Sequence, residues 1–194
     1  MGKQVHLVKI EALFEKSPVV EFKSIERIVG KSKKSSYAKL LVSNLLKKGK
    51  IKKIGKGVYT KYDEISLAVF SFKPAYLGLQ SALSYYGIWE QETIPVIITT
   101  RKVKRGLRKL IGRNVLLKNI DKRYFFGFEY VEEGGFYLPY SDLEKTFIDL
   151  IVFNQRIDEN ALKNIKKKLN KLKLLNYLKR YSLRTRERVL KKLK

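Results

Sequence analysis

Cysteine is absent from the 194-residue sequence, and histidine occurs once, at position 6. The first absence excludes disulfides, thiolate metal sites and cysteine nucleophiles, and the second excludes a metal site built from several histidines. No apolar run approaches the roughly 18 residues that a membrane-spanning helix needs. The N-terminus also lacks the charged-then-apolar pattern of a signal peptide. We therefore expect a cytoplasmic protein with no membrane partner.

Acidic residues are scarce compared with basic ones. The chain has 18 Asp and Glu against 43 Lys and Arg, so its formal net charge is +25. A hydrophobic content of 44% and an aromatic content of 12% are typical of a folded protein. The positive excess is larger than solubility requires, and it predicts a polyanionic partner.

The positive charge is concentrated in three segments. Residues 1–64 carry 16 basic and 6 acidic side chains, and residues 158–194 carry 14 and 3. The middle of the chain is closer to neutral, with 13 basic and 9 acidic side chains, and six of its basic residues lie between 101 and 109. This distribution favours discrete surfaces that contact a polyanion.

Residues 24–61 have the pattern of a winged helix-turn-helix. A short helix at 24–29 precedes a turn and a second helix at 35–48, and two strands follow at 51–54 and 58–61. The second helix of this motif enters the major groove of DNA. The alternative is a helix–hairpin packing unit whose basic face is merely solvated.

The second helix is amphipathic, and glycines follow it. Ser36, Lys39, Ser43 and Lys47 share its predicted exposed face. Gly49 stands where a left-handed residue ends a helix, and Gly55-Lys56-Gly57 is expected to turn with positive φ at its glycines. The apolar residues recur at three- and four-residue spacing and predict a buried stripe: Ala38, Leu41, Val42, Leu45 and Leu46.

The predicted DNA interface combines three sets of residues. The side chains expected to read bases or fix the position on DNA are Ser35, Ser36, Tyr37, Lys39, Ser43 and Asn44. Those expected to bind phosphates are Lys33, Lys34, Lys52, Lys53 and Lys56. The central basic segment adds Arg101, Lys102, Lys104, Arg105 and Arg108.

A domain boundary is expected at Asp63–Glu64, which gives a DNA-binding domain at 1–64 and a second domain at 65–194. The first domain is expected to begin with a helix at 5–16, in which Leu7, Val8, Leu13 and Phe14 are available for the buried face. In the second domain we expect strands at 94–100, 115–120, 124–131 and 136–138. Gly134-Gly135 is expected to turn between the last two strands. A helix is expected at 75–86, and a loop or short helix at 101–109. The expected fold class is α+β, with an N-terminal winged helix-turn-helix and a C-terminal mixed α/β domain that ends in basic helices.

The expected helices near the C-terminus have their own signals. Ser141 and Glu144 form a capping box for a helix that ends near Phe153. A last helix is expected at 184–193, and both basic helical segments either pack with a solvated outer face or contact nucleic acid. The remaining apolar residues predict one continuous stripe: Leu162, Ile165, Leu169, Leu172, Leu175 and Leu178.

Several phrases in this order resemble the AbiEi-type antitoxins, the transcriptional-regulator half of a bacterial and archaeal toxin–antitoxin pair. They are 55–60, 74–88, 94–101, 124–127 and 141–150. In the last phrase Leu143 replaces the family's proline. The resemblance implies a winged helix that binds inverted repeats in its own promoter, and a C-terminal domain that assists DNA binding and counters a nucleotidyltransferase-like toxin without a necessary stable complex. A free-standing regulator with the same architecture is equally compatible.

Glu144, Lys145 and Asp149 permit a catalytic interpretation, since nucleases place carboxylates and a lysine around a metal. On one helix, however, Glu144 and Asp149 point roughly 140° apart. The sequence also has no Asp-x-Asp and no phosphate-binding glycine loop. We expect a structural role for these residues and no catalytic residue, cofactor or metal site, hence no enzyme. A nucleic-acid-processing enzyme and an RNA-binding accessory protein stay as alternatives.

Overall fold

The computed structural model describes residues 2–30, 35–91 and 93–193, which divide into two compact units of the α+β class. Unit 1 comprises Met1–Phe72 and Lys109–Arg113, and unit 2 comprises Lys73–Arg108 and Asn114–Lys194. The boundary expected from the sequence, at residue 64, precedes the 3-10 helix η1 (Ile65–Phe72), which belongs to unit 1.

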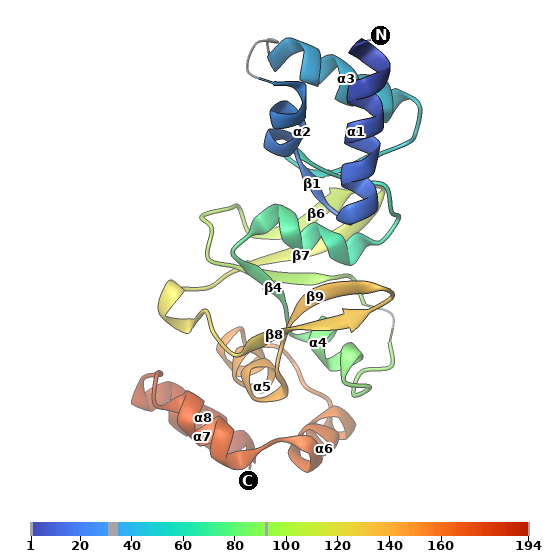
Figure 1. Cartoon of the computed structure of the whole chain (residues 1–194). Helices are drawn as coiled ribbons and strands as arrows, with labels where there is room; N and C mark the ends of the chain where they lie inside the picture. Colours follow the sequence, from blue (N-terminus) through green and yellow to red (C-terminus); the bar gives the residue numbers. More distant parts are fainter. Residues whose placement is uncertain (1, 31–34, 92, 194) are drawn as a thin grey trace. The chain divides into compact units, whose positions relative to one another are not determined.

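The described part of unit 1 contains the α-helices α1, α2 and α3, the 3-10 helix η1 and a small antiparallel sheet (Figure 1). Its elements follow the order α1 (Gly2–Lys16), β1 (Val20–Glu21), α2 (Phe22–Val29), α3 (Ser35–Lys47), β2 (Lys52–Gly55) and β3 (Val58–Thr60). Strand β3 lies between β1 and β2 and pairs antiparallel with both. The helices expected at 5–16, 24–29 and 35–48 and the strands expected at 51–54 and 58–61 are confirmed to within a few residues.

The core of unit 1 is formed by the apolar faces of its three helices. The predicted stripe of α3 is buried at Ala38, Leu41, Val42 and Leu45, and Leu46 is half-buried against the same cluster. The prediction for α1 was partly wrong. Ile10 and Phe14 are buried, but Val8, which was assigned to the buried face, is 63% exposed because it lies on the opposite side of the helix from Ile10.

The three glycines at 49, 55 and 57 have two different roles. Gly49 and Gly57 have φ of +66° and +69°, as expected for turn positions. Gly55 does not have a positive φ, so that part of the prediction was wrong. A Cβ at Gly55 would lie 2.5 Å from Cβ of Ser71, whose Oγ donates a hydrogen bond to the carbonyl oxygen of Ile54 at 2.9 Å. Glycine is required here by the close approach of η1 to β2.

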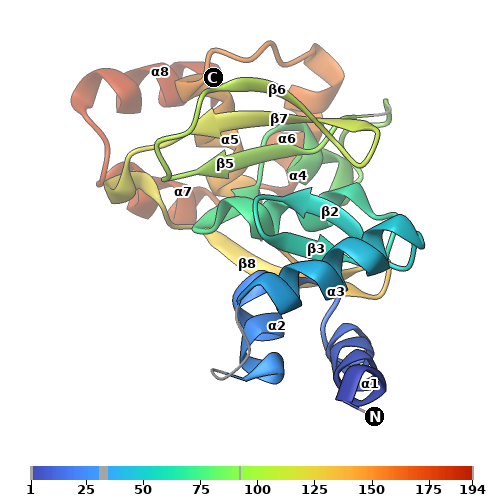
Figure 2. The same cartoon turned by 90° about the horizontal axis from the view of Figure 1, so that it is seen from above.

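A mixed sheet with the strand order β6-β7-β5-β4-β9-β8 belongs to unit 2, except for Lys109, Leu110 and Arg113 at the ends of β6 and β7. Figure 2 shows β6, β7 and β5 side by side. Pairing is parallel for β5–β7 and β4–β9, and antiparallel for β4–β5 and β8–β9. The strands are β4 (Ala75–Leu77), β5 (Val96–Thr99), β6 (Gly106–Leu110), β7 (Arg113–Asn119), β8 (Phe128–Glu133) and β9 (Phe136–Ser141).

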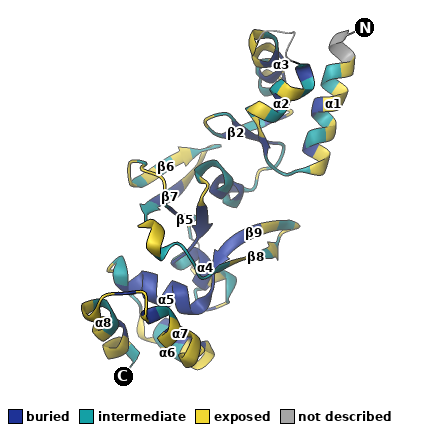
Figure 3. Ribbon diagram, turned by 60° about the vertical axis from the view of Figure 1, so that its left-hand side comes forward, coloured by how far each residue is buried: buried dark blue, intermediate teal, exposed yellow. Residues whose placement is uncertain are grey.

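Five helices accompany this sheet: α4 (Gln80–Tyr85), α5 (Leu143–Val152), α6 (Glu159–Lys168), α7 (Lys171–Leu178) and α8 (Leu183–Leu193). Tyr76, Val96 and Ile98 of the sheet join Phe147 and Ile148 of α5 in one hydrophobic cluster. Helix α5 is buried from residue 143 to 151, whereas the outer faces of α7 and α8 are exposed (Figure 3). None of the described helices is both long and apolar enough to cross a membrane.

The helix expected at 75–86 is wrong in its first half. Residues 75–77 form β4, which pairs on both sides, and only 80–85 are helical. All three residues of β4 are buried, so their hydrophobic pattern does not alternate and is easily taken for part of a helix. A Cβ at Gly78 would lie 2.6 Å from Cδ1 of Ile98, so glycine permits the chain to leave the strand there.

Two further expectations in unit 2 need correction at their boundaries. The segment 101–109 is neither entirely loop nor helix, because β6 begins at Gly106. Tyr124 belongs to a short 3-10 helix, η2 (Lys122–Tyr124), and β8 begins only at Phe128. The turn at Gly134-Gly135 is confirmed, with φ of +59° and +80° between β8 and β9.

The continuous leucine stripe is also wrong. Leu169 is extended, with ψ of 132°, and Asn170 caps α7 by accepting a hydrogen bond from the N–H of Lys173. This break changes the phase of the helix, so Leu174 is buried while Leu172 and Leu175 are 80% and 48% exposed.

Candidate nucleic-acid interface

The outward face of α3 is polar and basic, as expected. Ser36, Lys39, Asn44 and Lys47 are exposed, and Ser43 is half-buried. Lys39 and Lys47 form no ion pair with any described residue. Since α3 buries its opposite stripe in the core of unit 1, its backbone position is fixed while these side chains remain accessible. A helix of this kind can place short polar groups and ammonium groups against bases and phosphates.

Leu40 is a member of this face that the sequence analysis did not include. Its side chain is 48% exposed, and one helical turn separates it from Ser36 and Asn44. The helical period places Leu40 outside the predicted buried stripe, but the predicted exposed face named only serines and lysines. An exposed aliphatic group among hydrogen-bonding residues can contact the methyl group of thymine.

The first turn of α3 is held by contacts within unit 1. The hydroxyl of Ser35 donates a 2.7 Å hydrogen bond to Oε1 of Glu26 in α2. The ring of Tyr37 is half-buried and meets the ring of His6 edge-on, with centroids 6.0 Å apart. Lys33 and Lys34, which were expected to bind phosphates, lie outside the described residues.

The lysines of the β2–β3 hairpin fall into two groups. Lys52 forms an ion pair with Asp63, and Lys61 forms one with Glu15 at 2.7 Å. Lys53 and Lys56 are exposed and form no ion pair with any residue that the structure describes. The sequence-based prediction assigned Lys52, Lys53 and Lys56 equally to phosphate binding. In the structure Lys52 is paired with Asp63, so Lys53 and Lys56 are the two of these three lysines that remain available to bind phosphates.

The central basic residues belong to unit 2. Arg101, Lys102, Lys104 and Arg105 are exposed on the segment between β5 and β6. Arg108 lies on β6, where its Nη2 donates to the carbonyl oxygen of Lys104 at 2.9 Å. This hydrogen bond ties the segment to the strand.

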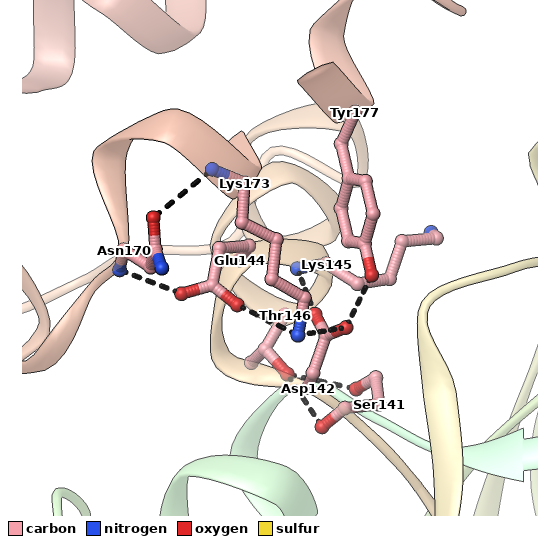
Figure 4. A network of polar contacts seen from close by, with 8 residues as sticks. All are labelled: Ser141, Asp142, Glu144, Lys145, Thr146, Asn170, Lys173 and Tyr177. Carbon is pink, nitrogen blue, oxygen red and sulfur yellow. Dashed lines mark hydrogen bonds and ion pairs between the residues drawn. The ribbon is translucent and has the colours of Figure 1, made fainter. Parts of the chain in front are cut away.

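A polar network surrounds the first turn of α5 (Figure 4). Asp142 is the N-cap, and its Oδ1 accepts a hydrogen bond from the N–H of Lys145 at 2.8 Å. Its Oδ2 accepts from the hydroxyl of Tyr177 at 2.6 Å and lies 3.0 Å from the ammonium of Lys173. Oε1 of Glu144 accepts from the N–H of Asn170 at 2.7 Å. The network therefore fastens α7 to α5.

These contacts correct the predicted capping box. The cap is Asp142 and not Ser141, because Ser141 is the last residue of β9 and its hydroxyl is engaged with Thr146 at 2.7 Å. Glu144 is directed to α7 and does not reach back to the start of its own helix. Sequence spacing alone does not distinguish Asp142 from its neighbour, since both residue types cap helices well.

The network shifts two pKa values. Burial, together with the hydrogen bond to Asp142, raises the pKa of Tyr177 to about 12. Burial acts against the ammonium form of Lys173, but the hydrogen bond to Asp142 and the negative charges nearby raise its pKa above the ordinary value. At neutral pH Tyr177 is a hydrogen-bond donor and Lys173 is a cation.

An ion pair lies fully buried in α5. Lys145 and Asp149 are one turn apart, and both side chains are 0% exposed. The hydroxyl of Tyr76 donates to Oδ2 of Asp149 at 2.7 Å, and the ammonium of Lys145 lies 5.5 Å from the centroid of the Tyr76 ring. Burial lowers the pKa of Lys145 and raises that of Asp149, while the charge of each partner opposes these shifts.

The side chains of the catalytic interpretation, Glu144, Lys145 and Asp149, are all buried. Neither Lys145 nor Asp149 reaches the surface, and Glu144 is only 5% exposed. Among the described residues no group of three or more His, Cys, Asp or Glu side chains is arranged to hold a metal ion. Glu144 accepts a hydrogen bond from Asn170 at the start of α7, and Asp149 is paired with Lys145 and Tyr76, so both carboxylates have structural partners.

The fold belongs to the α+β class, and a likeness to a solved structure agrees with this. No family model matches the sequence, and no curated protein matches it. Among solved structures, the chain is similar to the crystal structure of the RV2827C protein from Mycobacterium tuberculosis, with a TM-score of 0.62 and 12% sequence identity. The similarity covers 92% of this chain and 72% of that one. At this identity it concerns the fold alone.

Proposed function

We propose that the chain is a sequence-specific DNA-binding transcriptional regulator whose N-terminal unit is a winged helix-turn-helix. The observation that carries this proposal is the face of α3, where Ser36, Lys39, Asn44 and Lys47 are exposed on a helix anchored by its buried stripe. A recognition helix needs this combination of a fixed axis and accessible polar side chains.

The hairpin that follows α3 supports the proposal. The chain passes from α3 directly into β2 and β3, whose turn carries Lys56, with Lys53 beside it on β2. In a winged helix this hairpin contacts the phosphate backbone beside the groove that the recognition helix enters. Lys53 and Lys56 would contribute salt-dependent, sequence-independent affinity, and α3 would contribute the choice of sequence.

We further propose that this regulator is the antitoxin and autorepressor of a toxin–antitoxin pair, and that it binds inverted repeats in its own promoter. The support is the resemblance of five phrases of the sequence to the AbiEi-type antitoxins. If a nucleotidyltransferase-like toxin gene adjoins this one, expression of the toxin should arrest growth and coexpression of this chain should restore it. Growth arrest that persists despite soluble expression of this chain would contradict the antitoxin role without affecting DNA binding.

Fluorescence anisotropy tests the DNA-binding function. Duplex DNA from the region upstream of the gene is compared with a scrambled duplex over a series of salt concentrations. We expect the upstream duplex to bind at least about a hundredfold more tightly, since specific affinities commonly exceed nonspecific ones by roughly 10³ or more at physiological salt. Equal affinity for both duplexes would contradict the proposal.

Two substitutions assign the roles within unit 1. Lys39→Ala should weaken binding to the upstream duplex, and Lys56→Ala should weaken binding to both duplexes by a similar factor. Negligible losses from both substitutions would show that α3 and the hairpin are not the contact surface.

A further inference from the structure

A groove of about 1010 Å³ lies in unit 2, apart from the residues discussed above. Its apolar wall is formed by Trp89, Ile151 and Ile157, and the last turns of α8 form another part of its lining. Trp89 is half-buried and packs against the hydrophobic cluster of unit 2. Its indole Nε1 donates to no described acceptor, so packing alone holds the ring in place.

The charges that line the groove are mostly positive. Of the described residues that line it, Arg156, Arg188, Lys191 and Lys192 are basic and Asp158 is acidic. This carboxylate is already engaged, because its Oδ1 accepts a 2.7 Å hydrogen bond from the N–H of Ala161 at the start of α6. Arg156, Lys191 and Lys192 form no ion pair with any residue in the described part of the chain. The groove therefore has an excess of unpaired cations.

Arg188 is held in a defined orientation. Its Nη2 donates to the carbonyl oxygen of Ile151 at 2.7 Å and to Oδ1 of Asn154 at 2.5 Å. Asn154 has φ of +52°, a left-handed conformation that asparagine adopts more readily than most residues. One edge of the guanidinium is thus fixed by the chain that leaves α5, while its other nitrogens donate to no described residue.

We propose that this groove binds a nucleotide, with the base against the indole of Trp89 and the phosphates between Arg156, Lys191 and Lys192. Aromatic rings bind bases by stacking, and unpaired ammonium and guanidinium groups bind phosphate oxygens. The volume is at the upper end of the roughly 300–1,000 Å³ typical of small-ligand sites. In duplex DNA the base faces are covered by neighbouring pairs, so the nucleotide is either free or an unpaired nucleotide of a single strand.

This binding does not depend on the proposed recognition of duplex DNA, since the described lining residues all belong to unit 2. Trp89 is the only tryptophan in the sequence, so tryptophan fluorescence of the full-length chain reports directly on the groove. We would titrate the protein separately with ATP, with inorganic tripolyphosphate, with a five-nucleotide single strand (dT5) and with a short duplex. ATP or dT5 should change the fluorescence saturably, and the tighter of the two identifies the source of the nucleotide.

Variants measured by isothermal titration calorimetry separate the two contacts. Replacing both Lys191 and Lys192 by alanine should weaken ATP binding about tenfold or more, as expected for the loss of charge-assisted contacts. The matched control removes the same charge from the exposed face of α6, with Lys163→Ala and Lys167→Ala, and should leave the affinity within about twofold. Trp89→Leu should weaken the binding of ATP but not that of tripolyphosphate.

Four results would overturn the proposal. They are no saturable response to ATP or dT5, equal weakening by the control pair, ATP binding that is unchanged by Trp89→Leu, and displacement of ATP by the duplex at equal affinity. The last result would make the groove a part of the duplex-binding surface. Lys39→Ala should leave ATP binding unchanged, so failure of this proposal and failure of duplex recognition are distinguishable.

Discussion

The buried pair in α5 makes a prediction that does not depend on function. In Asp149→Asn the ammonium of Lys145 loses its counter-ion while its side chain remains 0% exposed. We expect unit 2 to lose about 3–5 kcal/mol of its free energy of unfolding at pH 7, the range for breaking one side of a buried ion pair. The pKa of Lys145, already lowered by burial, should fall further, because the charge of Asp149 no longer opposes the effect of burial.

Removing both charges should be far less harmful. In Lys145→Met with Asp149→Leu no unpaired charge remains, but the hydroxyl of Tyr76 loses its acceptor, which costs about 1–3 kcal/mol for a buried group. Adding Tyr76→Phe removes that hydroxyl as well. The triple variant should therefore unfold within about 1–2 kcal/mol of the wild type, since apolar replacements of buried pairs are often neutral or stabilising.

Urea unfolding at pH 7, followed by the fluorescence of Trp89, measures these differences. Trp89 packs against the same hydrophobic cluster as α5, so its signal reports on the part of the chain that contains the pair. The expected order of stability is Asp149→Asn lowest, the double variant intermediate and the triple variant highest. A loss below about 1 kcal/mol for Asp149→Asn, or a triple variant as unstable as the single one, would refute the reasoning from burial.

The hairpin lysines, Gly55 and Tyr177 can each be tested by substitution. Lys53→Ala should reduce the magnitude of the slope of log affinity for duplex DNA against log salt concentration by about 0.9, the value for one lost phosphate contact. Replacing both members of the Lys52–Asp63 pair by alanine should leave this slope nearly unchanged. Equal slopes for the two variants would contradict the division of the hairpin lysines. Gly55→Ala should destabilise unit 1 by about 1–3 kcal/mol in thermal unfolding, because a Cβ there meets a neighbouring side chain at 2.5 Å, and an unchanged Tm would show that η1 can move away. Above pH 10 Tyr177 ionises in the unfolded chain, whereas the folded chain keeps that proton up to about pH 12, so the free energy of unfolding should fall as the pH rises from 10 to 12. The fall should be smaller in Tyr177→Phe. Equal decreases for the wild type and the variant between pH 9 and pH 11 in urea unfolding would contradict this.

Much of unit 1 could be predicted from the sequence because its signals are local. The helical period places Leu41 and Leu45 on the buried stripe of α3, and the glycine at position 49 follows the helix end as expected. In unit 2 the local signals were insufficient. Strand β4 is buried on both faces, and its register with β5 and β9 depends on residues far away in the sequence. Leu169 interrupts the C-terminal helices at a position that apolar spacing does not mark.

The candidate interface shows the same division. The exposed residues of α3 follow from its period, and even Leu40 was accessible to that argument. The ion pairing of the hairpin lysines could not be predicted from the sequence, since only the fold brings Lys52 next to Asp63. The Trp89 groove is lined by side chains that lie about a hundred positions apart in the sequence, so no short sequence motif predicts it.

All residues from 141 to 150 are buried, and this bears on how proteins related to this one should be compared. These side chains have partners inside unit 2, so packing and hydrogen bonding alone restrict which residues they can be. Another chain with the same phrase would therefore be expected to share the architecture of this unit, whatever it binds. Chains that bind different operators, ligands or partners would be expected to differ in sequence on the outward side of α3, at the hairpin lysines and around Trp89. Substitutions at these positions alter recognition and leave the core intact.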